Sequence, residues 1–70
     1  MNELALFALL CKWLETHHWY RDGDDPGTWR NAAKPEWNGQ SFGYAVQAQL
    51  EAGFTAGDLM VLTQIVVDAS

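Results

Sequence analysis

Turn-forming sequences are concentrated between residues 20 and 40, and they limit how this chain of 70 residues can fold. The stretch contains Asp-Gly-Asp-Asp-Pro-Gly, then Lys-Pro and then Asn-Gly, which are sequences that interrupt regular structure. Long regular elements are therefore expected only before residue 20 and after residue 40. Because the chain is short, both parts must share one core, and we expect a single helical domain over residues 1–70.

Apolar residues on both sides of this stretch recur at the spacing of an amphipathic helix. Before it, Asn2 is a suitable N-cap for a helix whose apolar stripe runs from Leu4 to Leu14. Apolar residues cover much of the circumference of this helix, so we expect it to lie at the centre of the fold. After residue 40, Ser41 is a suitable N-cap for a second helix that ends at Gly53.

A third helix is predicted near the C-terminus by its capping residues. Thr55 and Asp58 have the spacing of a shortened capping box, and an apolar pattern with helical spacing follows them. The adjacent β-branched residues Val66 and Val67 also fit a strand, but the capping residues and the length of the segment favour a helix.

The turn-rich stretch itself is expected to hold a short fourth helix from Pro26 to Ala33. Asp25 can cap this helix, and proline is accepted in a first helical turn. The sequence therefore predicts an all-α fold, a small bundle of three main helices with the short fourth helix in the loop over residues 20–40.

The net charge of −5 is unevenly distributed along the chain. Residues 41–70 contain no lysine or arginine, and they supply an acidic face of Glu51, Asp58 and Asp68. Binding to DNA, RNA or an anionic membrane depends mainly on cationic side chains that neutralise phosphate groups. We therefore expect no direct contact with nucleic acid and none with a membrane.

Residues 48–62 also have the apolar spacing of a helix-turn-helix motif. The second helix of such a motif reads DNA, and here it would present Gly57, Asp58, Met60, Val61 and Gln64. None of these side chains can bind a phosphate or a guanine as arginine does. We therefore expect these residues to pack as a helix-turn-helix does, and DNA binding is the less favoured function.

The only cysteine, Cys11, cannot form an internal disulfide, which favours a reducing, cytoplasmic setting. The apolar run from Leu4 to Cys11 follows Glu3 and lacks the preceding basic residues of a signal peptide. The run is also much shorter than the roughly 20 residues that a membrane-spanning helix needs. We expect neither a signal peptide nor a membrane span.

Two groups of residues have the spacing of metal ligands, and neither predicts a metal site. Cys11, Glu15 and His18 would share one side of the first helix, but one thiol and one imidazole there serve the core and the helix end more often than zinc. A calcium-loop pattern begins at Asp22 but has Ala33 where a bidentate glutamate is required. No catalytic motif is present either, so we expect no metal, no cofactor and no enzymatic activity.

Four tryptophans in so short a chain are the most unusual feature of the composition. Trp13 lies in the apolar first helix and is expected in the core. Aromatic and arginine side chains also dominate binding hot spots, so core packing and partner binding remain alternatives for the others. The predicted partner-binding residues are Trp19, Tyr20, Arg21, Trp29, Arg30 and Trp37.

Two resemblances bear on function. The string Glu-Ala-Gly-Phe-Thr-Ala-Gly-Asp-Leu, residues 51–59, is similar to short stretches in phage replication proteins. The small acidic domain as a whole resembles, in type and without a specific motif, the phage and mobile-element inhibitors of host machinery, of which anti-CRISPR proteins are one group. The latter resemblance implies a protein that binds a host complex and blocks it.

The sequence therefore predicts a non-enzymatic protein-interaction module. Its expected partner is a protein, such as a host CRISPR-Cas defence complex or another nucleic-acid-processing complex, which the phage-encoded module would occlude. The alternative is a structural or regulatory protein, such as a phage replication or accessory factor, that forms a homodimer through Val61, Ile65 and their neighbours. DNA binding by a helix-turn-helix and metal binding are less favoured.

Overall fold

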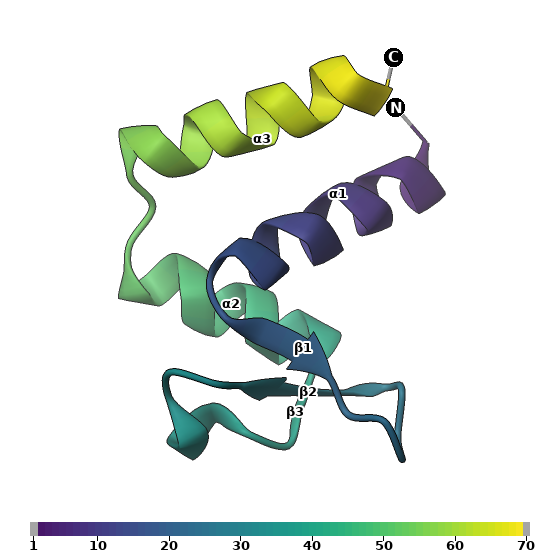
Figure 1. The fold of residues 1–70 in the computed structure, drawn as a ribbon, viewed down its shortest axis with the longest axis vertical. Coiled ribbons are helices and arrows are strands. Elements are labelled where there is room, and N and C mark those ends of the chain that lie inside the picture. The colour runs from purple at the N-terminus through teal and green to yellow at the C-terminus, as the bar shows by residue number, and fades with distance from the viewer. Residues whose placement is uncertain (1, 70) are drawn as a thin grey trace.

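The computed structural model describes residues 2–69 and contains three helices and a three-stranded antiparallel sheet (Figure 1). The expected all-α bundle is therefore wrong, and the fold is α+β. In chain order the elements are α1 (Glu3–Thr16), β1 (Trp19–Arg21), β2 (Thr28–Asn31), the 3-10 helix η1 (Pro35–Trp37), β3 (Gln40–Ser41), α2 (Phe42–Ala52) and α3 (Ala56–Ala69).

The short helix predicted from Pro26 to Ala33 is replaced by strand β2. Asp25 does act as a local cap, but it closes a turn, because its side chain accepts hydrogen bonds from the Gly27 amide at 3.2 Å and from the Thr28 hydroxyl at 2.7 Å. The Thr28 amide also donates to the Asp25 carbonyl at 2.9 Å. This turn reverses the chain so that β2 returns alongside β1, and the stretch becomes a hairpin.

Strand pairing sorts the side chains of the hairpin into two faces. Trp19 lies opposite Asn31, Tyr20 opposite Arg30, and Arg21 opposite Trp29. Because side chains alternate along a strand, Trp19 and Trp29 point into the fold on the same face. β3 extends the sheet on the other edge of β2, where Gln40 pairs with Trp29.

The predicted caps of the helices are confirmed. The Asn2 side chain accepts from the Ala5 amide at 2.8 Å and begins α1, and the Ser41 hydroxyl accepts from the Tyr44 amide at 3.4 Å and begins α2. Gly53 ends α2 with a φ of 138°, a value that residues with a side chain rarely adopt. The C-terminal segment is helix α3, so the strand alternative is wrong.

α1 is the central element, as expected. In Figure 1 it lies between α3 on one side and the sheet with α2 on the other, and α3 runs antiparallel to it. The buried core gathers where α1, the hairpin and α2 meet, and its members are Cys11, Trp13, Leu14, Trp19, Trp29 and Ala45. Among residues 2–69, no helix combines the length and apolar character needed to cross a bilayer.

The burial of Trp29 gives the first testable prediction. Trp29→Ala removes a side chain that is 1% exposed, and we expect it to lower the free energy of unfolding by about 3–5 kcal/mol. A domain of this size has a net stability of roughly 3–5 kcal/mol, so the variant should be largely unfolded by circular dichroism.

Tyr44→Ala is the control, because it removes an aromatic side chain that is 64% exposed. It should change the free energy of unfolding by about 0.5 kcal/mol or less. Equal losses in the two variants would contradict the assignment of Trp29 to the core.

Candidate functional site

The six residues expected to bind a partner do not form one surface. Trp19 and Trp29 lie in the core, with 2% and 1% of their surface exposed, because the hairpin turns them inward on the same face. Their expected exposure is therefore corrected. Neither can contact a partner in the folded domain, so alanine substitution at these positions would measure folding instead of binding.

Tyr20 and Arg30 stay accessible on the outer face of the hairpin. The Arg30 Nε donates to the Tyr20 hydroxyl at 3.4 Å, and one Arg30 terminal nitrogen lies 3.6 Å from the Asp22 carboxylate. Arg21 lies on the opposite face, with its guanidinium 5.4 Å from the Trp29 ring centroid, where it covers an edge of the core. These contacts are ordinary stabilising pairs for a short hairpin.

Trp37 is half-buried and closes the other end of the hairpin. Its ring stacks on that of Trp19, with centroids 5.2 Å apart and planes 7° apart. The Lys34 ammonium lies 4.4 Å from the Trp37 ring centroid. Of the six predicted partner-binding residues, Trp37 is therefore the one that packs on a core tryptophan and remains partly exposed.

The acidic face expected from Glu51, Asp58 and Asp68 is also corrected. Asp58 is buried, with 6% of its surface exposed, whereas Glu51 and Asp68 are exposed. Glu51 accepts from Gln47 and Asp68 accepts from Gln64, each pair one turn apart on its helix. The three carboxylates thus do not act together.

Asp58 joins α3 to α1. One carboxylate oxygen accepts from the Trp13 indole N–H at 3.2 Å and contacts the Nε2 of His17, both on or just after α1. The other accepts from the Thr55 amide at 2.8 Å and from its hydroxyl at 3.0 Å, while the Thr55 hydroxyl accepts from the Asp58 amide at 3.2 Å. The predicted capping box is confirmed, and its carboxylate has a second function between helices.

These donors stabilise the charged form of Asp58. The backbone N–H of Thr55 lowers the pKa of the carboxyl well below its usual range, and the hydrogen bond from His17 lowers it further. Asp58 is therefore a carboxylate at neutral pH. Since a carboxylate only accepts hydrogen bonds, the Nε2 of His17 carries the proton between them.

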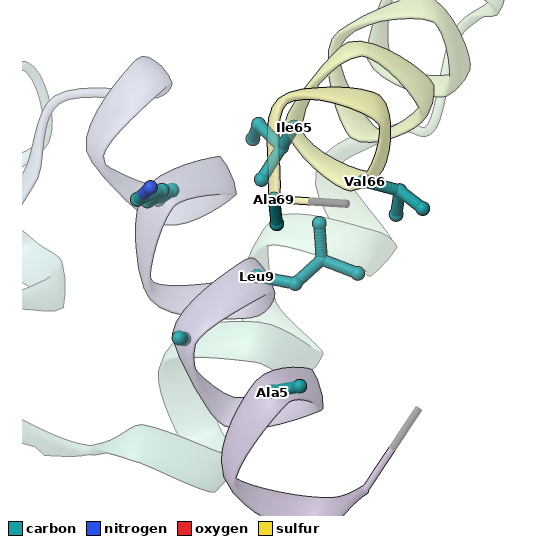
Figure 2. A pocket seen from close by; sticks show the side chains of 7 residues that line it. Ala5, Leu9, Ile65, Val66 and Ala69 are labelled. Atoms are coloured by element: carbon teal, nitrogen blue, oxygen red, sulfur yellow. The ribbon is translucent and has the colours of Figure 1, made fainter.

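An apolar groove lies between α1 and α3, and we refer to it as the α1–α3 groove. Its volume is about 110 Å³, and it is lined by Ala5, Ala8, Leu9, Lys12, Ile65, Val66 and Ala69. Figure 2 shows Leu9 reaching from α1 towards Ala69, with Ile65 on the α3 side and Ala5 on the α1 side. Small residues on facing turns leave this space open, because alanine side chains cannot fill the distance between two helices.

Exposed apolar side chains are concentrated on the same two helices. Leu4, Leu6 and Phe7 of α1 and Leu59, Met60 and Val67 of α3 are all exposed. None of these residues lines the groove, and Phe7 packs against Phe42 of α2. An apolar groove on helices that expose further apolar side chains is typical of an interaction surface. Sequence reasoning missed this site because it assigned the apolar residues of α1 and α3 to a helical core.

The charge of the helices differs from that of the hairpin region. Within α1, α2 and α3 there are five carboxylates, and Lys12 is the only lysine or arginine, which gives a net charge of −4. The segment between α1 and α2 carries the other three cationic residues and is close to neutral. The α1–α3 groove is thus an apolar site between helices of net negative charge, and its one charged lining residue is Lys12.

The metal-binding alternatives gain no support from the geometry. In the described part of the chain, no three His, Cys, Asp or Glu side chains come together in a way that could hold a metal ion. Cys11 is buried in the core, while Glu15 and His18 are exposed. The helical spacing therefore did not bring these three candidate ligands to one place.

Comparisons with known proteins identify no relative. No protein-family model, no curated protein and no solved structure matches this chain.

Asp58 gives a prediction for the acid dependence of stability. The pKa of Asp58 is lower in the folded state than in the unfolded state, where it has the ordinary aspartate value of about 4. Its contribution to stability is therefore fully present above about pH 4, and it is lost as the pH falls through the folded-state pKa. Asp58→Asn should be destabilised at pH 7, since an amide group cannot accept from Thr55, Trp13 and His17 together. The difference in free energy of unfolding between this variant and the natural protein should narrow below pH 4. Urea unfolding at each pH measures this difference.

Asp68→Asn is the matched control, because Asp68 is exposed and bonded only to Gln64 one turn away. We expect a much smaller loss at pH 7 in this variant. An equal loss of free energy of unfolding in the two variants would show that the carboxylate does not hold α3 on α1. A loss in Asp58→Asn that does not change with pH would show the same.

Proposed function

We propose that the domain is a non-enzymatic protein-interaction module that binds its partner at the α1–α3 groove. The observation that carries the proposal is the apolar groove, which lies between two helices that also expose apolar side chains outside it. Burying such a surface is the main favourable contribution to protein association. The binding surface proposed here replaces the one expected around Trp19 and Trp29.

The charge of the helices favours a partner with basic residues around an apolar segment. A groove on a part of the molecule with a net charge of −4 attracts a cationic surface and repels an acidic one. Lys12 lines the groove, where its ammonium group can form an ion pair with one carboxylate of the partner. We propose an amphipathic helix with a basic rim as the element that binds.

This chemistry agrees with the inhibitor role that the type resemblance implies. Complexes that process nucleic acid, CRISPR-Cas complexes among them, use basic surfaces to bind phosphate groups. A small phage-encoded domain with an apolar groove between helices of net negative charge would occlude such a surface in the cytoplasm of the host. Occlusion by ordinary protein binding explains the composition better than mimicry of DNA, because Asp58 is buried and Glu51 and Asp68 lie on different helices.

Homodimerisation is the second candidate, and one observation favours it. Met60 and Val67 of α3 are 72% and 59% exposed, which leaves an apolar strip on this helix for a second copy to cover. The charge of −4 on the helices of each copy opposes this contact, and opposes it more at low salt. Light scattering at high protein concentration distinguishes homodimerisation from binding of a different protein. A monomer at all salt concentrations would contradict the dimer.

The groove is tested with a designed helical peptide of leucine and lysine, labelled for fluorescence anisotropy. Ala69→Lys places a long cationic side chain at the groove and should weaken binding of this peptide by about tenfold or more, since it fills the apolar site and repels the lysines of the peptide. The substitution suits the fold, because a cation is favourable in the last turn of a helix.

Gln64→Lys is the matched control, because it adds the same charge to an exposed position of α3 that does not line the groove. We expect it to weaken binding about threefold or less, the effect of charge alone. A leucine–glutamate peptide of the same length should bind poorly. Equal losses in the two variants, or equal affinity for the two peptides, would contradict the proposed site and the proposed chemistry.

A further inference from the structure

A second cavity lies at the other end of α1, where the chain turns from α1 into β1. It has a volume of about 150 Å³ and lies between the end of α1, the turn from β2 to η1 and the second half of α2. The side chains that matter in its wall are His17, His18, Asn31, Lys34, Trp37 and Gln49. None of them lines the α1–α3 groove, so a ligand bound in this cavity is independent of the proposed function.

The orientation of the Gln49 amide is fixed by the core. Gln49 is only 7% exposed, and its Oε1 accepts a hydrogen bond from the indole N–H of Trp19 at 2.9 Å. An indole nitrogen can only donate, so the oxygen of Gln49 must face Trp19 and the NH₂ group must face the opposite way. Among residues 2–69 this NH₂ group has no hydrogen-bond partner, and it is not sealed from the cavity that Gln49 lines.

The hydrogen-bond acceptors of the cavity wall are already in use. The Oδ1 of Asn31 accepts from the amides of Ala33 and Lys34 at 2.9 and 2.8 Å. The carbonyl of His17 accepts from the Asn31 side-chain amide at 3.1 Å, and that of His18 accepts from the Ala32 amide at 2.9 Å. The wall therefore offers donors to a bound group and few acceptors.

Cationic and aromatic side chains complete the wall. The Lys34 ammonium lies over the Trp37 ring, 4.4 Å from its centroid, which holds a positive charge beside the cavity. His18 adopts a φ of 72°, and it is the only non-glycine residue with a positive φ in the described chain. This conformation costs about 1–2 kcal/mol for a residue with a side chain. It places an imidazole at the cavity.

We propose that this cavity binds a single carboxylate group, held by the NH₂ group of Gln49 and the ammonium of Lys34 against the Trp37 ring. With a volume of about 150 Å³, the cavity has room for a group of a few heavy atoms. One lysine matches the single charge of a carboxylate better than the two charges of a phosphate. The group belongs either to a free small acid or to the C-terminus of a peptide.

Gln49→Glu is the sharpest variant, because it is isosteric and keeps an acceptor for the Trp19 indole. It replaces the donor NH₂ group by an anionic oxygen, which repels a carboxylate. We expect affinity to fall by more than about tenfold, since a hydrogen bond to a charged group is lost and a like charge is gained. Gln47→Glu is the control, because it adds the same charge to an exposed position of α2 outside this cavity.

Lys34→Gln tests the same cavity without touching the core. Lys34 is exposed, so this variant should fold normally, and it should weaken binding by about threefold. It keeps the proposal testable if a buried glutamate at position 49 unfolds the domain.

Binding is followed by NMR through the Trp37 indole N–H, with acetate, an acetylated tri-alanine peptide and the C-terminal amide of that peptide as probes. Saturable shifts with acetate as strong as with the free peptide identify a small acid as the ligand, and shifts with the free peptide alone identify a chain end. Either result must be lost in Gln49→Glu and kept in Gln47→Glu. Absence of saturation with every probe, equal binding of the amidated peptide, or full binding by Gln49→Glu overturns the proposal.

Discussion

The carboxylate of Asp58 links the start of α3 to the end of α1. It begins α3 through Thr55 and at the same time accepts from Trp13 and contacts His17 at the end of α1. A buried carboxylate is costly unless donors surround it, and here the donors come from both helices. Asp58 therefore helps to set the position of α3 along α1, and in that position the alanines that line the α1–α3 groove leave space between the two helices.

The sequence predicted the helices well because their ends are marked locally. Asn2, Ser41, Gly53 and the Thr55–Asp58 pair each act within one helical turn, so no knowledge of the rest of the fold is needed. The hairpin was missed because its strands have only 3 and 4 residues and its turn-forming residues look like a loop. Asp25 was expected to cap a helix and instead closes a turn. An aspartate can do either, and the outcome depends on whether the residues after it bond to one another in a helix or to a neighbouring strand, here β1.

The candidate sites were harder to predict than the fold, for a related reason. Tryptophan and arginine are common both in small cores and in binding surfaces, and only strand register decides that Trp19 and Trp29 point inward. Asp58 was assigned to a surface because its contacts with Trp13 and His17 cross more than forty residues of sequence. The two cavities depend on how elements distant in sequence meet, so no local pattern indicates them.

The separation between Asp58 and its partners on α1 also has a kinetic consequence. Contacts between α1 and the hairpin close short loops, whereas the pairing of Trp13 with Asp58 spans 45 residues and closes a loop nearly two thirds of the chain in length. Closing so long a loop costs more conformational entropy than closing a short one, so we expect α3 to dock on α1 later in folding than the hairpin does. A partner seated in the groove would therefore slow hydrogen exchange of the α3 amides, because docking of the helix and occupation of the groove are linked equilibria.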